Sequence, residues 1–211
     1  KGKNLAAQNL ETAVADIAFE DGQFVVVGTD RAIDWFNLAA ATPERLSVTR
    51  ENHMDTPVFP NGCHICEVEL DPETGAYQIV RYFTVDDVGR AINPMIVEGQ
   101  THGGIVQGVG QALGEAIVLD AASGQMLSGS LMDYPLPRAD EFPSFNCELH
   151  EVPSPTNPLG VKAGGEGGTT PAPAVMVSAV VDALSSQGIH HVELPLTSHA
   201  IWRALQAAKK C

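Results

Sequence analysis

The chain has 211 residues, 44% of them hydrophobic, which is long enough for one large domain or two small ones with a sizeable core. Its 12 basic and 26 acidic residues give a formal net charge of −14, and so acidic a surface argues against nucleic-acid binding because it repels phosphate backbones. No segment approaches the ~20 apolar residues of a membrane helix. Residues 1–7 lack the apolar core of a secretory signal, so we expect a cytoplasmic protein without a membrane partner.

The first quarter of the chain predicts short helices around a strand. Between residues 3 and 17, apolar side chains recur with a period near 3.6, which predicts a helix. A turn at Glu20-Asp-Gly22 leads into a strand over 23–28, and a second helix is expected over 33–41. Residues 42–61 contain three prolines and predict a long connection.

The middle of the chain predicts a hairpin followed by a long helix. Strands over 64–70 and 76–83 flank a turn that contains proline and glycine. The helix expected over 94–117 contains six glycines, each of which costs up to about 1 kcal/mol relative to alanine. Such a helix needs its glycines for a close approach of its backbone to another element or to a ligand.

The last third of the chain alternates strands and helices without a regular βαβ series. Prolines force residues 133–138 into an extended form. Strands are expected over 146–152 and 191–194, and helices over 171–184 and from a cap at Thr197 or Ser198 to Leu205. The pattern predicts an α+β fold in which helices pack on mixed or antiparallel sheets. We expect two lobes, about 1–85 and 86–211.

One loop places a single carboxylate among glycines. Gly160-Val-Lys-Ala-Gly-Gly-Glu-Gly-Gly-Thr169 surrounds Glu166 with five glycines and precedes a helix start at Thr170-Pro171. Glycine permits close approach of a backbone or a ligand, and the N–H groups of a helix N-terminus favour anions. The alternative is an ordinary glycine-rich turn with a solvated acid.

Other short patterns are weaker. A phosphate-binding loop is excluded because Lys162 precedes the glycines rather than following them. Gln100 can offer a donor and an acceptor to a heterocycle, or can simply be exposed. His102 is more often a hydrogen-bonded structural histidine than a base. Cys63 and Cys66 have the spacing of a metal or redox pair, but lie in a predicted strand where they face opposite sides. We interpret the cysteines as structural thiols of a reducing compartment.

Five motifs in a fixed order carry a resemblance that none carries alone. Together they resemble the C-terminal part of the molybdopterin-binding large subunit of the xanthine dehydrogenase, aldehyde oxidase and aerobic carbon monoxide dehydrogenase family, over essentially the whole chain. The motifs lie at residues 59–75, 87–94, 99–113, 132–139 and 157–168.

The resemblance implies a function and a set of residues. Members of this family hydroxylate a carbon, such as that of an aldehyde or an N-heterocycle, with oxygen from water at a molybdenum held by a pterin. Glu166 matches the glutamate that acts as general base toward the molybdenum-bound hydroxyl. Gln100 matches the glutamine that contacts the pterin, and Gly99, Lys162 and Gly165 complete the expected cofactor contacts. No residue of this chain is expected to ligate the metal.

The resemblance also implies partners, because the family's large subunits are several times longer. We expect the N-terminal part of that subunit, together with iron–sulfur and flavin domains or subunits, to complete the enzyme. The pterin is a mononucleotide or a cytosine dinucleotide. This chain alone is then expected to be inactive and to bind the cofactor weakly or not at all. Two alternatives stay open: a non-catalytic assembly module that docks on a larger oxidoreductase subunit, and redox or metal binding through Cys63 and Cys66.

Overall fold

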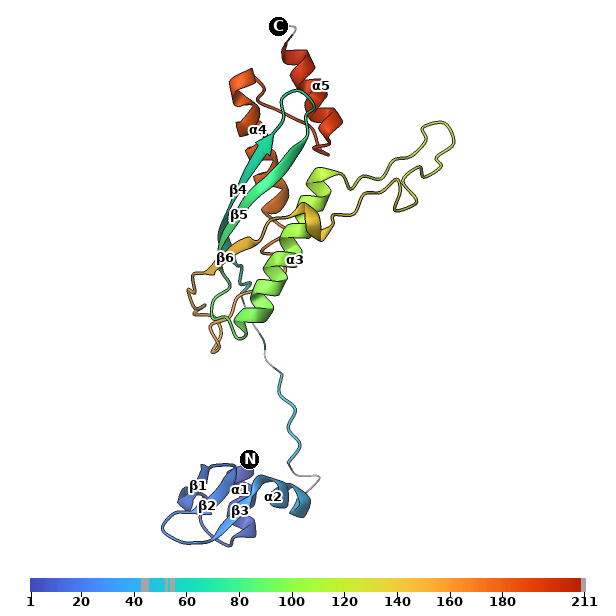
Figure 1. Cartoon of the computed structure of the whole chain (residues 1–211). Coiled ribbons are helices and arrows are strands. Elements are labelled where there is room, and N and C mark those ends of the chain that lie inside the picture. Colours follow the sequence, from blue (N-terminus) through green and yellow to red (C-terminus); the bar gives the residue numbers. More distant parts are fainter. Residues whose placement is uncertain (43–45, 52, 54–55, 210–211) are drawn as a thin grey trace. The chain divides into compact units, whose positions relative to one another are not determined.

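The computed structural model describes residues 1–42, 46–51, 53 and 56–209 (Figure 1). The chain divides into two compact units, residues 1–53 and 54–211. The sequence-based expectation set the boundary near residue 85 instead. The difference arises because the strands over 61–87 pair with a later strand and pack on a later helix. The long connection expected over 42–61 lies partly outside the described residues.

Among its described residues, the first unit has a small antiparallel sheet and two α-helices. Its strand order is β1-β2-β3, and its core consists of Leu5, Ala6, Ala7, Ile17, Phe24, Val26 and Leu38. Its elements are α1 (Gly2–Asn9), the 3-10 turn η1 (Val14–Asp16), β1 (Ile17–Glu20), β2 (Gln23–Val26), β3 (Ala32–Asp34) and α2 (Trp35–Ala41).

Both helices of this unit are shorter than predicted. Glu11 has a φ of 48°, so the chain leaves α1 and turns into β1 instead of continuing a helix to residue 17. Residues 32–34 pair with β2 before α2 begins. Asp34 then caps α2, because its carboxylate accepts hydrogen bonds from the backbone N–H groups of Phe36 (3.0 Å) and Asn37 (2.9 Å).

In its described part, residues 56–209, the second unit contains a mixed sheet and three α-helices. β4 and β5 are antiparallel, as the hairpin prediction required, and β5 and β6 are parallel. Its elements are β4 (Asn61–Leu70), β5 (Tyr77–Asp87), α3 (Pro94–Leu113), η2 (Ala139–Glu141), β6 (Phe145–Leu149), α4 (Ala172–Leu184), η3 (Ser185–Gln187) and α5 (Ser198–Ala208). The predicted α+β class, with helices on mixed and antiparallel sheets, is confirmed.

Two helices cover one face of this sheet. Cys66 of β4 contacts Met176 of α4 (Sγ–Sδ 3.6 Å), and Phe145 of β6 packs edge-on against His102 of α3. The buried cluster between helices and sheet includes Tyr82, Ile105, Val109, Met176 and Val180. The alternation of buried and exposed side chains along β4 and β5 leaves Ile65, Phe83 and Val85 on the opposite, exposed face.

Three further predictions can be compared with the structure. α3 ends at Leu113 rather than near 117, and an arm over residues 115–138 then projects from the unit (Figure 1). Residues 191–194 form no strand. Thr197 caps α5 as predicted, since its hydroxyl accepts a hydrogen bond from the backbone N–H of Ala200 (3.1 Å). Among the described residues, no helix combines the length and apolar character needed to cross a membrane.

Candidate functional site

The glycines of α3 separate into two groups by what lies next to them. A Cβ built on Gly104 would lie 2.9 Å from the backbone nitrogen of Thr169, and one on Gly108 would lie 2.8 Å from the carbonyl oxygen of Thr169. A Cβ built on Gly99 or Gly103 would meet nothing within 4 Å. The first group therefore lets another backbone approach α3, and the second leaves an open strip on its surface.

The backbone that approaches α3 is the predicted glycine loop. A Cβ on Gly168 would lie 2.4 Å from the carbonyl oxygen of Thr101, so only glycine fits there without movement. The Thr169 hydroxyl donates to the carbonyl of Gly104 (3.1 Å) and to the side-chain oxygen of Gln107 (3.3 Å). These contacts fix the downstream end of the loop on the side of α3.

The loop places Glu166 near Gln100. A Cβ built on Gly165 would lie 3.7 Å from Nε2 of Gln100. Glu166 is the next residue, and both it and Gln100 are exposed. Gly99 precedes Gln100 on the open strip. The structure thus brings Gly165 beside Gln100, which lies 65 positions earlier in sequence, and Glu166 and Gly99 are their immediate neighbours in the chain.

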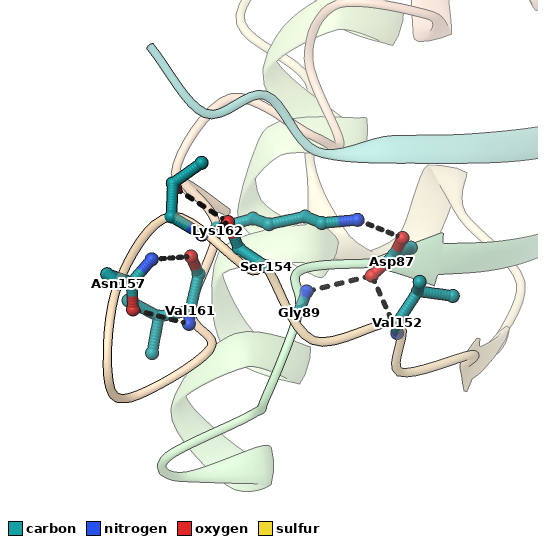
Figure 2. Close-up of polar contacts among 8 residues, drawn as sticks. Asp87, Gly89, Val152, Ser154, Asn157, Val161 and Lys162 are labelled. Atoms are coloured by element: carbon teal, nitrogen blue, oxygen red, sulfur yellow. Dashed lines mark hydrogen bonds and ion pairs between the residues drawn. The ribbon is translucent and has the colours of Figure 1, made fainter. Parts of the chain in front are cut away.

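Lys162, the fifth predicted residue, points elsewhere. Its ammonium lies 2.5 Å from Oδ2 of Asp87, at the end of β5, and both side chains are only 12% exposed. Asp87 Oδ1 also accepts hydrogen bonds from the backbone N–H groups of Gly89 (2.8 Å) and Val152 (3.1 Å). Figure 2 shows the lysine side chain extended from the loop to this carboxylate. The Lys162 ammonium is therefore occupied by a protein partner.

Burial and hydrogen bonding shift the pKa of Asp87 in opposite directions. Burial alone raises the pKa of this carboxyl, but the hydrogen bonds from Lys162 and the two amides outweigh it, so the pKa lies below its ordinary value of 3.8. Asp87 is a residue that sequence reasoning missed as a site residue. It is the first residue of the motif at 87–94, yet its partner lies 75 positions away, and no local pattern connects the two.

The remaining candidates from the sequence have structural contacts. His102 packs against Phe145 with ring centroids 5.3 Å apart, and its Nε2 has no hydrogen-bond partner within the described residues. Cys63 is exposed on one face of β4 and Cys66 lies on the other, against Met176. In the part of the chain that the structure describes, no group of three His, Cys, Asp or Glu side chains is placed to hold a metal ion.

Comparison with known proteins connects this geometry to a family. Residues 1–143 match the family model of the molybdopterin cofactor-binding domain. The chain belongs to this family. The sequence is also 36% identical over its full length to the 6-hydroxypseudooxynicotine dehydrogenase complex subunit gamma of Paenarthrobacter nicotinovorans. That alignment includes the Glu166 loop, which the family model does not reach.

Two further relatives of this family also match the chain over almost its whole length. It is 35% identical, over 98% of its length, to the carbon monoxide dehydrogenase large chain of Hydrogenophaga pseudoflava. It superposes on the crystal structure of quinoline 2-oxidoreductase from Pseudomonas putida 86 with a TM-score of 0.80, 35% identity and 97% coverage. The predicted family is confirmed. The chain spans little more than a quarter of these relatives, 28%, 27% and 28% of their lengths.

The residues beside the open strip suit a pterin. Gln100 carries an amide donor and an amide acceptor, which match the mixed donors and acceptors of a heterocycle edge. Gly99 and Gly103 leave room for a flat ring against α3, because neither carries a side chain and nothing lies within 4 Å of where a Cβ would be. Gln107, one turn along from Gly103, lies beside the Thr169 hydroxyl. The two glutamines offer hydrogen-bonding groups there without a charge.

Proposed function

We propose that this chain is the C-terminal part of the large subunit of a molybdenum hydroxylase and supplies its general base, Glu166. The observation that carries the proposal is the position of Glu166 next to Gly165, which lies against Gln100 beside the open strip of α3. Gln100, Gly99 and Gly165 would contact the pterin, as a mononucleotide or cytosine dinucleotide. The bound molybdenum cofactor supplies the two-electron oxidation and the water-derived oxygen.

The chain's own contribution is a proton acceptor at a fixed place. Glu166 is exposed, and within the described residues its side chain makes no hydrogen bond, so its carboxylate oxygens are available. Its carbonyl accepts hydrogen bonds from the backbone N–H and the hydroxyl of Thr170, both at 3.0 Å. Glu166 would accept the proton of the hydroxyl that attacks the substrate carbon.

We further propose that the N-terminal part of the same subunit, with iron–sulfur and flavin domains or subunits, completes the enzyme. The first two relatives support this, since they are named as the subunit of a complex and as a large chain. N-heterocycles are the first substrates to test, because the names of the 6-hydroxypseudooxynicotine dehydrogenase subunit and of quinoline 2-oxidoreductase point to that class. The free thiols Cys63, Cys66 and Cys147 support a reducing, cytoplasmic location.

The test of the proposed base is Glu166→Gln in the full-length, assembled enzyme. Removing a general base lowers turnover by about 10²–10⁴-fold, while molybdenum and pterin content should stay at the wild-type level because glutamine fills the same space. The matched control is Glu98→Gln. Glu98 is an exposed acid at the end of α3 that carries Gln100, and the Glu98→Gln enzyme should turn over normally. Wild-type turnover in Glu166→Gln would refute the proposal.

A second candidate function has one observation in its favour. Gly104, Gly108 and Gly110 of α3, and Gly114 directly after it, all lie against other parts of this chain, so most of these glycines serve packing. The chain could then be a non-catalytic assembly module, with Gly99 and Gly103 packed against the rest of the subunit. Gly103→Leu separates the two. It should lower the molybdenum and pterin content of an assembled enzyme if the strip faces the cofactor, and block assembly itself if the strip is an interface.

A further inference from the structure

We infer that the largely buried Asp87–Lys162 ion pair is a positioning device for Glu166, so that Lys162 acts on the reaction through the loop and does not bind the cofactor. The inference rests on the proposed role of Glu166 as base. It goes beyond that role because it assigns a function to Asp87 and changes the one expected for Lys162.

The upstream anchor of the loop consists of several contacts around the end of β5. In addition to the ion pair, the backbone N–H of Lys162 donates to the carbonyl of Val88 (2.8 Å), and Val161 forms an antiparallel bridge with Gly89. Asn157 closes the preceding turn onto Val161 from both sides, at 2.9 and 3.1 Å (Figure 2). Lys162 is thus held by its main chain and by its side chain.

The downstream anchor lies on α3, at Gly168 and Thr169. Only residues 163–167 span the distance between the two anchors, and Glu166 belongs to this span. Its side chain has no hydrogen bond within the described residues, so the place of its carboxylate depends on where the two anchors hold the backbone. Loosening either anchor should therefore displace the base.

The burial of the pair argues against a direct contact between Lys162 and the cofactor. Both side chains are 12% exposed, and turning the ammonium toward a ligand would leave Asp87 buried beside two amides without its counter-charge. An uncompensated buried charge is strongly unfavourable. Lys162 therefore stays on Asp87 when the enzyme is loaded.

The test uses the full-length assembled enzyme with Lys162→Met, Asp87→Asn, the double variant and the charge-conserving Lys162→Arg. The matched control is Arg81→Met with Glu67→Gln, an exposed pair on the same hairpin with 3.6 Å between its charged atoms. Turnover is followed by dye reduction with quinoline, nicotine or benzaldehyde, whichever the wild type oxidises fastest. Molybdenum and pterin content and the hydrogen exchange of residues 163–167 are measured on the same samples.

We expect each single variant to lower kcat by about 10- to 100-fold, since a displacement of about 1 Å is enough for such a loss. KM and molybdenum content should change little, and exchange in 163–167 should become faster while α4 stays protected. The double variant should lose no more than either single variant, because the two residues act as one unit. Lys162→Arg should recover much of kcat, and the control pair should resemble the wild type.

Three results would overturn the inference. One is wild-type kcat and wild-type exchange in both single variants. Another is a loss of molybdenum or pterin content in Lys162→Met that Asp87→Asn does not share, which would make Lys162 a cofactor contact. The third applies if the charge-removing variants do not fold. Asp87→Glu keeps the charge but shifts the carboxylate, so it should lower kcat. A normal kcat in Asp87→Glu would then overturn the inference. Failure of the proposed function is distinguishable, because it would appear as full activity in Glu166→Gln.

Discussion

At the scale of single residues, two carboxylates near the candidate site are used in opposite ways. Asp87 is buried and accepts hydrogen bonds from three donors, which keep its charge in place. Glu166 is exposed, and its side chain makes no hydrogen bond within the described residues. The first arrangement suits a structural anion and the second suits a proton acceptor, although both residues carry the same functional group.

The buried Asp86 should make stability depend on pH. Burial raises the pKa of Asp86, but hydrogen bonds from His64 and Thr84 outweigh it and hold the pKa below 3.8. Such a carboxylate stabilises the fold above its unfolded-state pKa, and the contribution is lost as the pH falls below about 4. Asp86→Asn should lower the urea midpoint at pH 7 and flatten its decline below pH 4. Asp182→Asn, at an exposed site, should do neither, and an unchanged acid decline in Asp86→Asn would contradict the account.

The thiols should differ in reactivity. Burial, with the charge of Glu67, raises the pKa of Cys66 to about 12, and burial with nearby acids raises that of Cys147 to about 11. Since the thiolate is the reactive form, iodoacetamide at pH 8 should modify the exposed Cys63 well before either of them. Peptide mapping by mass spectrometry measures the order, and urea should abolish the difference. Equal labelling of the folded chain would contradict this burial.

At the scale of elements, the glycines of α3 differ in what lies beside them. Gly104 and Gly108 admit the loop that carries Glu166, and Gly99 and Gly103 remain open beside Gln100. The glycine content of this segment predicted close approach correctly. It could not tell which glycine meets another part of the chain and which stays open, because the loop is about 60 residues further along the chain.

The two groups of glycines predict opposite effects of alanine. Gly104→Ala brings a Cβ to 2.9 Å from the nitrogen of Thr169 and 3.0 Å from Cα of Gly168. The resulting overpacking should lower the free energy of unfolding by about 1–3 kcal/mol. Gly103→Ala meets nothing within 4 Å and should raise it by up to about 1 kcal/mol through helix propensity. Urea denaturation of both variants checks the contrast, and equal destabilisation would be inconsistent with the packing described.

At the scale of the whole molecule, local patterns predicted elements better than connections. The hairpin, the capped helix at Thr197 and the helix at 171–184 follow from turn residues and periodicity, which are local. The parallel pairing of β6 with β5 joins Tyr82 to Phe145 and is not visible in any window of sequence. The predicted boundary near residue 85 differed from the structure for this reason, and the Asp87–Lys162 pair was missed for the same one.

The two units should be separable in stability. Each has its own buried cluster of apolar residues, so removal of residues 1–53 should leave the thermal midpoint of the second unit within a few degrees of its value in the full chain. Differential scanning calorimetry of both proteins measures this. Loss of a cooperative transition in the shorter protein would show that the second unit depends on the first.

The central claim is that Glu166, Gln100 and the open strip of α3 face the molybdenum cofactor. An experimental structure of the full-length, cofactor-loaded enzyme tests it most directly. We predict the pterin within hydrogen-bond distance of the Gln100 amide, the Glu166 carboxylate directed at the metal, and the Lys162 ammonium still on Asp87. A cofactor bound away from this strip, with Glu166 buried against another part of the protein, would contradict the account.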